Sequence, residues 1–456
     1  MGTLTMVAES VSGTLFGADR TFESVSTDTR MLEPGQLFFA LQGERFDAAS
    51  FVEEASRRGA AGAVVAQRQT CDVPQVEVGD TRAALGLFAK SWRARFPITV
   101  IAVTGSNGKT TVKEMMANIL VADAGDESDV LVTAGNLNNE IGLPLTILRM
   151  RERHRVAVLE MGASRPGDIA YLADIAAPGI AVVTNAGAAH LEGFGSREVV
   201  AATKGELLES LPADGVAVIN RDDPFFETWK HLAGSANLLS FGLDDQADYR
   251  AVDIDETFTD KGCELSFDIQ SPDGTINVHL PMAGRHNVLN ALSAAAASRA
   301  AGASPRAVQQ GLAAMGNIPG RLRAVTGTCG ARLYDDSYNA NPVSVKAAID
   351  FLSGRDGETW LVLGDMAELG TDSAALHAEI GAAAKAAGVS RLFCVGEESR
   401  TSAQVFGECG QWFPDREALT VALMSAARDG VTILVKGSHC MGLEKVVEAL
   451  QGESRG

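Results

Sequence analysis

The sequence predicts an α/β protein of three domains, built around a central, mostly parallel sheet of the phosphate-loop type with helices on both faces. Three observations predict this fold class. The chain has 456 residues, which is enough for two or three domains. Continuous apolar runs alternate with helical segments, as in buried parallel strands. The segment GNIPGRL at 316–322 has the composition of a linker. We therefore expect domains at residues 1–84, 85–317 and 318–456.

The first domain is expected to be a small α/β unit. Its segment FVEEASRRGAAGAVVAQ, which begins at Phe51, predicts a helix, a glycine stop and a buried strand. The segment TRAALGLFAKSWRARF, which begins at Thr81, predicts a helix that leads into the second domain.

The second domain is expected to repeat a strand followed by a helix. Five apolar runs predict its strands: ITVIAV from Ile98, VLVT from Val130, VAVLE from Val156, IAVVTN from Ile180 and VAVIN from Val216. Between Tyr249 and Leu280 the residues alternate around an Asp-Gly turn, which predicts a hairpin. An alanine-rich helix then ends at Gly302.

The third domain is expected to contain a second α/β sheet. The runs TWLVLGD from Thr359, RLFCVG from Arg391 and VTILVKG from Val431 predict buried strands with helices between them.

Composition limits the kinds of partner. Lys and Arg number 39 against 58 Asp and Glu, a net charge of −19, which argues against nonspecific binding to nucleic acid or anionic membranes. An anionic substrate would need a local pocket of cations and amides. The six cysteines are far apart and form no CxxC pair, which favours free thiols in a reduced, cytoplasmic setting. We recognise no signal peptide at the N-terminus, and no apolar run approaches the length of a membrane span.

The stretch AVTGSNGKTTVKEM, which begins at Ala102, predicts a phosphate-binding loop. It follows a strand and opens a helix at about Lys109, so that backbone N–H groups and the helix N-terminus converge on an anion. Lys109 would contact the outer phosphates, and the Thr110 hydroxyl would bind Mg²⁺. In the usual pattern a glycine stands where this chain has Val103; here the glycine is at 105. The alternative is a glycine-rich turn without a ligand.

Other polar side chains follow the predicted strands. Glu160 ends a strand where a magnesium ligand belongs, although it could be an ordinary strand-end acid. His190 lies just beyond another strand end, where a structural role is the alternative. Lys204 follows on a helix and could be simply a solvated lysine. The loop GNLNNEIGLP at 135–144 could bind a sugar or phosphate through its amides or form an Asx turn.

Taken together, these stretches resemble the Mur ligase family. Its motifs are matched in order by TGSNGKTTVKEM, GNLNNEIGLP, LEMGA, TNAGAAHLEGFGS, KGELLE, GRHNVLNALSAAA, DDSYNANPVS, LGDMAELG and VKGSHCMGLEKVV. The motifs DDSYNANPVS and LGDMAELG resemble the members that join D-alanyl-D-alanine to UDP-N-acetylmuramoyl-tripeptide. The N-terminal STDTRMLEPGQLFFALQGERFD resembles a uridine-nucleotide domain.

The resemblance implies a role for each matching residue. It implies catalytic roles for Lys109, Glu160, His190 and Lys204. The implied ATP-binding residues are Gly105, Ser106, Asn107, Gly108, Lys109, Thr110, Thr111, Asn287, Arg321 and Asp336. The implied metal ligands are Thr110, Glu160, His190 and, if it is carbamylated, Lys204. The UDP-substrate would be held by Ser26, Asp28, Thr29, Arg30, Asn136 and Asn139. Tyr338, Asn339 and Asn341 would shape the site where the third domain closes.

One corner of the first domain departs from the family. The family often shows FDGHDF after the LQG turn, whereas this chain has FDAASF with Ala48, Ala49 and Ser50, so that a glycine and a histidine are missing. The motifs of the two catalytic domains are intact.

The implied reaction uses ATP and Mg²⁺ to activate a carboxylate as an acyl phosphate, which the incoming amine then attacks; the enzyme is expected to be a monomer. Alternatives are another ligase of the same chemistry, such as a folylpolyglutamate synthase, a phosphate-loop kinase or NTPase, and a non-catalytic nucleotide-sugar-binding protein. A kinase or NTPase would leave Lys204 and the third domain unexplained. No GxGxxG with a downstream acid follows a strand, so we set a dehydrogenase aside.

Overall fold

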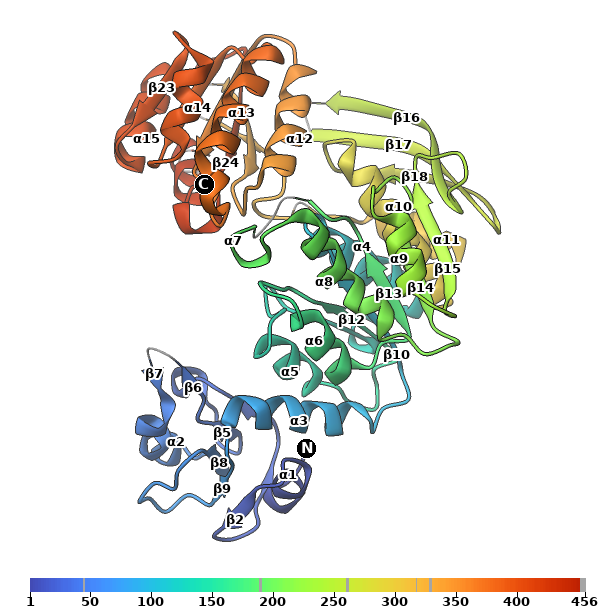
Figure 1. The fold of residues 1–456 in the computed structure, drawn as a ribbon, viewed down its shortest axis with the longest axis vertical. Coiled ribbons are helices and arrows are strands. Elements are labelled where there is room, and N and C mark those ends of the chain that lie inside the picture. The colour runs from blue at the N-terminus through green and yellow to red at the C-terminus, as the bar shows by residue number, and fades with distance from the viewer. Residues whose placement is uncertain (44–45, 188–190, 260–261, 317, 328–329, 452–456) are drawn as a thin grey trace.

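The structure, a computed structural model, is of the predicted α/β class. It describes residues 1–43, 46–187, 191–259, 262–316, 318–327 and 330–451. Three units follow one another along the long axis, each built on its own main sheet (Figure 1). We call them the first, central and third units.

The first unit contains a five-stranded sheet in the order β2-β9-β8-β5-β4, in which only β2 runs antiparallel to its neighbour. Its main strands are β2 (Thr14–Phe16), β4 (Val25–Ser26), β5 (Leu37–Phe39), β8 (Gly62–Val65) and β9 (Gln75–Glu77). Two short pairs join β1 (Gly2–Thr3) to β3 (Thr21–Phe22) and β6 (Gln42–Gly43) to β7 (Phe46–Asp47). Its helices are α1 (Leu4–Ser10), α2 (Val52–Arg57) and the short 3-10 turns η1 (Thr29–Met31) and η2 (Ala48–Phe51).

Helix α3 (Thr81–Arg93) joins the first unit to the central unit. Asp80 caps its N-terminus by accepting hydrogen bonds from the backbone N–H groups of Arg82 and Ala83. The ring of Phe88 lies 6.1 Å from that of Phe22 and 6.3 Å from that of Phe39, both in the first unit. The same buried cluster continues into the central unit. The first and central units therefore share one hydrophobic core.

The central sheet has the strand order β11-β12-β10-β13-β14-β15-β16-β17-β18. Its parallel strands are β10 (Thr99–Thr104), β11 (Val130–Val132), β12 (Val156–Glu160), β13 (Ile180–Val183), β14 (Val216–Asn220), β15 (Asn237–Gly242) and β16 (Tyr249–Thr259). An antiparallel edge follows with β17 (Gly262–Ser271) and β18 (Gly274–Leu280). Strand β10 lies between β12 and β13, so the chain order reverses there. Ligands of such sheets bind at the carboxyl ends of the strands beside this reversal.

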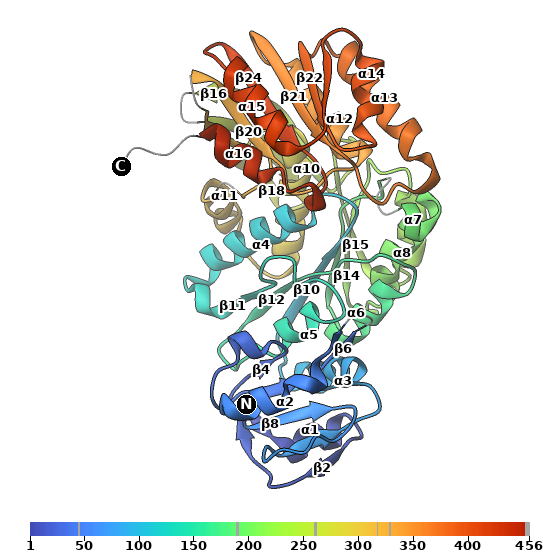
Figure 2. The ribbon, with the colours of Figure 1, turned by 90° about the vertical axis from the view of Figure 1, so that its left-hand side faces the viewer.

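Helices cover both faces of the central sheet (Figure 2). Ala102 and Leu159 pack into one core and their neighbours Val103 and Val158 into the other, as expected for parallel strands buried on both sides. One face carries α4 (Lys109–Ala124), α10 (His286–Ala300) and α11 (Pro305–Ala313). The other carries α3, α5 (Gly142–Ile147), α6 (Asp168–Ala176), α8 (Arg197–Glu209) and α9 (Phe226–Leu232). Short helices η3 (Glu127–Asp129) and α7 (Leu191–Phe194) complete the unit.

The third unit has a six-stranded sheet in the order β19-β20-β24-β21-β22-β23, parallel except for β19. Its strands are β19 (Arg323–Thr326), β20 (Arg332–Asp336), β21 (Glu358–Gly364), β22 (Arg391–Val395), β23 (Gly410–Phe413) and β24 (Val431–Lys436). Its helices are α12 (Pro342–Ser353), α13 (Ser373–Ala386), α14 (Ser399–Phe406), α15 (Arg416–Ala426), α16 (Glu444–Gln451) and the short η5 (Gly370–Asp372) and η6 (His439–Met441). Two core clusters, almost entirely its own, cover the two faces of this sheet.

The predicted strands, the hairpin and the alanine-rich helix are all present. The sequence patterns did not predict β15, β19, β20 or β23, nor any strand of the first unit other than β8. Among the described residues, no helix is both long enough and apolar enough to cross a membrane.

Candidate active site

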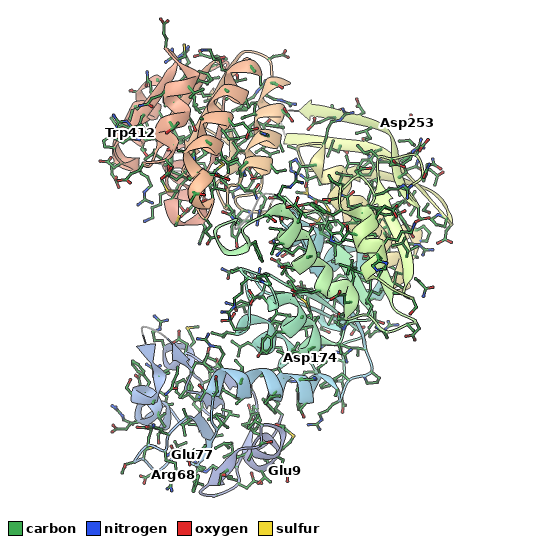
Figure 3. The ribbon with its side chains drawn as sticks, in the orientation of Figure 1. Glu9, Arg68, Glu77, Asp174, Asp253 and Trp412 are labelled. Atoms are coloured by element: carbon green, nitrogen blue, oxygen red, sulfur yellow. The ribbon has the colours of Figure 1, made fainter. Side chains whose placement is uncertain are left out.

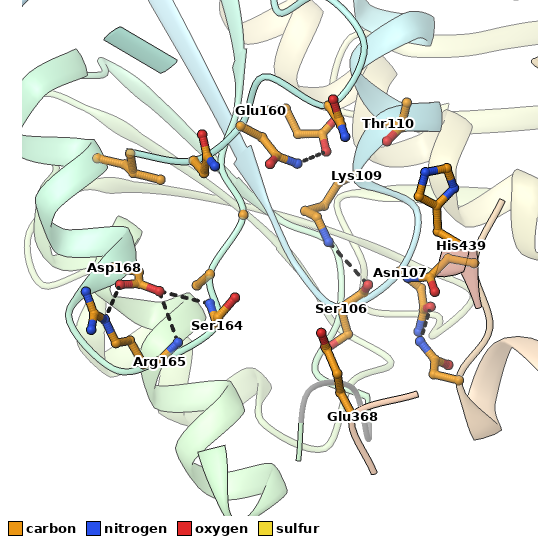
Figure 4. A pocket seen from close by; sticks show the side chains of 18 of the residues that line it. Ser106, Asn107, Lys109, Thr110, Glu160, Ser164, Arg165, Asp168, Glu368 and His439 are labelled. Atoms are coloured by element: carbon orange, nitrogen blue, oxygen red, sulfur yellow. Dashed lines mark hydrogen bonds and ion pairs between the residues drawn. The ribbon is translucent and has the colours of Figure 1, made fainter. Parts of the chain in front are cut away.

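A pocket of about 1080 Å³ lies at the carboxyl ends of the central strands. Figure 4 shows it from close by, and the third unit forms one wall of the pocket. Its lining includes Asp80, Arg82, Ser106, Asn107, Lys109, Thr110, Asn136, Asn138, Asn139, Glu160, Asp168, Arg321, Tyr338, Asn339, Asn341, Glu368, Lys436 and His439. Helix α3, the central sheet and the third unit thus meet at one site.

The loop between β10 and α4 can exist only with glycine at two positions. Gly105 has φ +144° and Gly108 has φ +83°. A Cβ atom at Gly105 would overlap Thr184 Oγ1, and one at Gly108 would overlap Asn290 Oδ1. The displaced glycine of the sequence motif is therefore required by the neighbouring strand end.

The end of β13 holds this loop in place. Asn185 accepts hydrogen bonds from the backbone N–H of Ser106 at 2.9 Å and from that of Asn107 at 3.0 Å. The Asn107 carbonyl accepts from Thr184 Oγ1 at 2.7 Å and from Asn185 Nδ2 at 3.0 Å. The loop is thus fixed on both its donor and its acceptor sides.

Lys109 stands half-buried in the first turn of α4. Its Nζ donates to the Gly105 carbonyl at 2.6 Å and to the Ser106 carbonyl at 3.3 Å. Burial lowers the pKa of Lys109, and the opposing effect of Glu160 does not restore it. Thr110 lines the pocket beside it, whereas Thr111 is buried and does not.

Glu160 is a buried carboxylate at the same edge of the sheet. Strands β10 and β12 pair so that Val103 lies opposite Glu160. The Glu160 side chain accepts a hydrogen bond from Asn138 Nδ2 at Oε1, with a distance of 2.7 Å. Its other oxygen, Oε2, is buried and has no hydrogen-bond partner within the described part of the chain. A buried carboxylate oxygen in that condition is a suitable ligand for a cation.

Lys204 is buried on α8, so the interpretation of it as a solvated lysine is wrong. Its side chain is 2% exposed, and its Nζ lies 5.5 Å from the ring centroid of Phe194. Burial, with a further contribution from the charge of Lys109, lowers the pKa of Lys204 to about 7. Lys204 does not line the pocket. His190, the other candidate from this region, lies outside the described residues.

The described side chains fit a magnesium ion better than a structural metal. No group of three His, Cys, Asp or Glu side chains that could hold a metal occurs in the described ranges. Mg²⁺ needs only one or two carboxylates, because phosphate oxygens and water complete its shell. Thr110 and the unpartnered oxygen of Glu160 lie beside the phosphate loop and are oxygen atoms of the kind that Mg²⁺ binds.

The asparagine loop forms the Asx turn that was one of its two predicted alternatives. Asn139 Oδ1 accepts from the backbone N–H of Ile141 at 3.2 Å and of Gly142 at 2.9 Å, which is an Asx-type turn. Asn136 and Asn139 also line the pocket, so ligand binding by the loop stays a prediction. The sequence reasoning missed Asn138. Its signal was present, because Asn138 follows β11 and Glu160 is the last residue of the neighbouring parallel strand β12.

The third unit reaches the phosphate loop through polar contacts. Asn341 Nδ2 donates to Asn107 Oδ1 at 2.7 Å. The guanidinium carbon of Arg321 lies 4.2 Å from the ring centroid of Tyr338, and both residues line the pocket. Glu368, Lys436 and His439 also line this wall, and none was singled out from the sequence.

Two candidate ATP-binding residues lie behind the pocket wall. Asn287 is buried, donates to the Ala283 carbonyl at 2.7 Å and accepts from Asn290 Nδ2 at 2.8 Å. Asp336 accepts from Lys436 Nζ at 2.6 Å and from the Leu322 N–H at 3.1 Å. Neither lines the pocket.

The candidate nucleotide-sugar residues of the first unit also lie away from this pocket. Asp28 caps η1, and the Arg30 side chain hydrogen-bonds to its carboxylate, which lowers the pKa of Asp28 to about 2. Ser26 Oγ donates to the Asp28 carbonyl at 3.0 Å, and Thr29 is buried. Residues 48–51, where the sequence departs from the family motif, form the 3-10 turn η2.

Comparison with known proteins gives a consistent result over the whole chain. Residues 103–298 match the model "Mur ligase middle domain", and residues 320–439 match "Mur ligase, glutamate ligase domain". The UDP-N-acetylmuramoyl-tripeptide–D-alanyl-D-alanine ligase of Escherichia coli is 44% identical over 98% of both chains. A crystal structure of MurF from Acinetobacter baumannii aligns with a TM-score of 0.91 at 32% identity, over 99% of both chains. MurF from Thermotoga maritima, solved in complex with ADP, aligns with a TM-score of 0.83 at 30% identity, over 94% of this chain and 97% of that one.

Proposed function

The chain belongs to the Mur ligase family, and from this premise we propose that it joins D-alanyl-D-alanine to UDP-N-acetylmuramoyl-tripeptide at the expense of ATP. The products are the UDP-linked pentapeptide, ADP and phosphate. One observation carries the assignment: a ligase with this named reaction matches the chain from end to end. The pentapeptide is a peptidoglycan precursor, which connects the protein to cell wall biogenesis, cell shape and cell division.

The chemistry follows from the poor reactivity of a carboxylate. The tripeptide carboxylate attacks the γ-phosphorus of ATP, ADP leaves, and an acyl phosphate forms. The amine of D-alanyl-D-alanine then attacks the acyl carbon through a tetrahedral intermediate, and phosphate departs. Gly105 through Thr111 would hold the ATP phosphates, and Lys109 would neutralise charge that develops during transfer. The ADP complex of the Thermotoga maritima relative supports ATP as the co-substrate.

Magnesium belongs to the same proposal. Thr110, Glu160, His190 and a carbamylated Lys204 would hold the ion, which when bound neutralises the repulsion between phosphate and carboxylate. The unpartnered Oε2 atom of Glu160 supports its part in this set.

The environment of Lys204 supports carbamylation. Only a neutral amine can attack CO₂ to form the N–C bond of a carbamate, with loss of a proton. A pKa of about 7 leaves roughly half of the amine neutral at neutral pH. An ordinary lysine would be almost fully charged. A carbamate signal in the carbon NMR spectrum after incubation with labelled bicarbonate, absent from Lys204→Met, tests this step.

Residues of all three units complete the proposed substrate sites. Asn287, Arg321 and Asp336 would bind the adenine and ribose side of ATP after closure of the third unit. Ser26, Asp28, Thr29, Arg30, Asn136 and Asn139 would hold the UDP-substrate. We also propose that the protein has domains at 1–84, 85–317 and 318–456, that it is a monomer, and that it is located in the cytoplasm.

One assay tests the function. The protein receives ATP, Mg²⁺, UDP-N-acetylmuramoyl-tripeptide and D-alanyl-D-alanine, and phosphate and pentapeptide are measured together. We expect both to appear in equal amounts and only when the dipeptide is present. Phosphate release that ignores the dipeptide would favour a phosphate-loop NTPase.

A further inference from the structure

We propose that Asn138 is a positioning residue that fixes how Glu160 presents its carboxylate to the metal. The inference rests on the proposed function in one respect, namely that Glu160 is a magnesium ligand. It concerns a residue that lies outside the candidate set.

The contact between the two side chains has only one chemical arrangement. A carboxylate oxygen can only accept, so the amide nitrogen of Asn138 must face Glu160 and donate to Oε1 at 2.7 Å. This donor occupies one oxygen and leaves Oε2 buried with no partner in the described structure. Figure 4 shows this hydrogen bond as the dashed line on Glu160, above Lys109. Mg²⁺ demands near-ideal octahedral geometry, so the direction of one free oxygen matters more than it would for Ca²⁺.

A neutral donor suits this position. A lysine or arginine at the same place would also orient Glu160, but its charge would cancel the negative charge that attracts the cation. An amide orients the carboxylate and leaves its charge intact.

Asn138 is itself held by its surroundings. The backbone carbonyl oxygen of Asn138 accepts from the Gly162 N–H at 2.8 Å, and its backbone N–H donates to the Asn136 carbonyl at 2.7 Å. Its side-chain amide lies flat against Gly162, where a Cβ would come within 3.0 Å of Oδ1 and 3.3 Å of Nδ2. The glycine therefore makes room for the amide of Asn138.

The backbone of Glu160 is fixed separately. Its N–H donates to Thr133 Oγ1 at 3.0 Å, and the Thr133 carbonyl accepts from the fully buried Lys113 Nζ at 2.9 Å. With the main chain held from this side, the hydrogen bond from Asn138 restrains the side chain.

The test measures metal binding without turnover. Mg²⁺ is titrated into the full-length protein with a non-hydrolysable ATP analogue. The Mg²⁺ midpoint is the Mg²⁺ concentration at half-maximal binding, and it is measured by the shift in melting temperature and by calorimetry. Loss of such a supporting hydrogen bond typically weakens metal affinity 10- to 100-fold. We expect Asn138→Ala to raise the Mg²⁺ midpoint by about that factor, while affinity for the analogue in excess EDTA stays unchanged.

A second variant reaches the same hydrogen bond without removing Asn138. Gly162→Ala places a methyl group against the amide and should raise the midpoint in the same direction. In the double variant the shortened residue 138 leaves space for that methyl group. The double variant should therefore bind Mg²⁺ no more weakly than Asn138→Ala alone.

The matched control is Asn277→Ala. Asn277 Nδ2 donates to Asp268 Oδ1 at 2.6 Å on the exposed β17–β18 hairpin, which is the same kind of bond away from the pocket. Its midpoint should equal that of the wild type. Equal midpoints for wild type and Asn138→Ala would overturn the proposal; if that variant does not fold, an unchanged midpoint in Gly162→Ala would overturn it. Absence of any Mg²⁺ dependence in the wild type would instead overturn the metal part of the proposed function.

Discussion

The central unit meets its two neighbours in different ways. Toward the first unit it shares a continuous hydrophobic core through α3, reinforced by hydrogen bonds from Trp92 Nε1 to the Met150 carbonyl and from Arg93 Nε to the Ala176 carbonyl. Toward the third unit there are polar contacts, such as Asn341 to Asn107, and among the described residues the buried core clusters of the third unit include only Ala283 from the central unit. Buried apolar area resists separation, whereas a few hydrogen bonds can be exchanged with water. The difference indicates that the first and central units move as one body, whereas the third unit can move relative to them.

The backbone between the central and third units supports this comparison. Leu322 has φ +50°, an unusual value for a residue with a side chain, and Gly320 beside it has φ +69°. Figure 3 shows the first and third units at opposite ends of the molecule, with the central unit between them. We therefore expect motion at residues 318–322 to bring the third unit onto bound nucleotide.

The largest effect should come from breaking the shared core. Phe88→Ala removes a buried ring from between the first and central units and should cost about 3–5 kcal/mol of unfolding free energy. Urea unfolding followed by hydrogen exchange should show both units losing protection together. Phe393→Ala, an equally buried ring in the third unit, is the control and should lower protection there alone. Independent loss of the first unit in the Phe88 variant would contradict the shared core.

Next in size is the loss of the phosphate-loop lysine. Lys109→Ala should lower the turnover rate ~10²–10³-fold, which corresponds to a loss of about 2.7–4 kcal/mol of transition-state stabilisation. The loss is large because the contact strengthens as charge develops on the phosphoryl group. Its melting temperature should stay close to that of the wild type, in contrast to Phe88→Ala. Rapid-quench measurement of the pentapeptide provides the rate. Near-normal turnover would remove the loop from the mechanism.

A pH dependence tests the interior of the central unit, away from both interfaces. The pKa of Lys204 is about 7 when folded and near 10.5 when unfolded, so the unfolded state binds the extra proton between these values. Unfolding free energy should therefore rise with pH across this window, by about 1.4 kcal/mol per pH unit at most. Lys204→Met should lack this increase in bicarbonate-free urea titrations. Parallel pH profiles for the two proteins would show that Lys204 titrates normally.

The smallest effect should come from the polar interface. Asn341→Ser keeps a good helix cap for α12 but is too short to reach Asn107, so one hydrogen bond worth about 0.5–1.5 kcal/mol is lost. We expect a several-fold lower turnover and an unfolding free energy lower by no more than that amount. Small-angle scattering should show the wild type contracting with nucleotide and both substrates, and the variant contracting less. An unchanged radius of gyration in the wild type would count against closure.

The sequence predicted what depends on local pattern and on strand order. Apolar runs located the parallel strands, and the rule that parallel strands end at one edge brought Glu160 beside the phosphate loop. It could not predict that Asn290 packs against Gly108, or that Phe88 joins two cores, because these contacts join segments distant in the chain. Lys204 shows the same limit: a lysine on a helix is usually solvated, and only tertiary packing buries this one.

The anchoring of the phosphate loop has a thermodynamic consequence. Because Thr184 and Asn185 already hold Ser106 and Asn107 in place, nucleotide binding need not freeze a flexible segment. Ordering a residue costs about 1–2 kcal/mol of conformational entropy, and a cradle that is rigid beforehand avoids that cost. The affinity for ATP should then depend little on loop entropy and mainly on charge. We therefore expect added salt to weaken ATP binding more than a rise in temperature does.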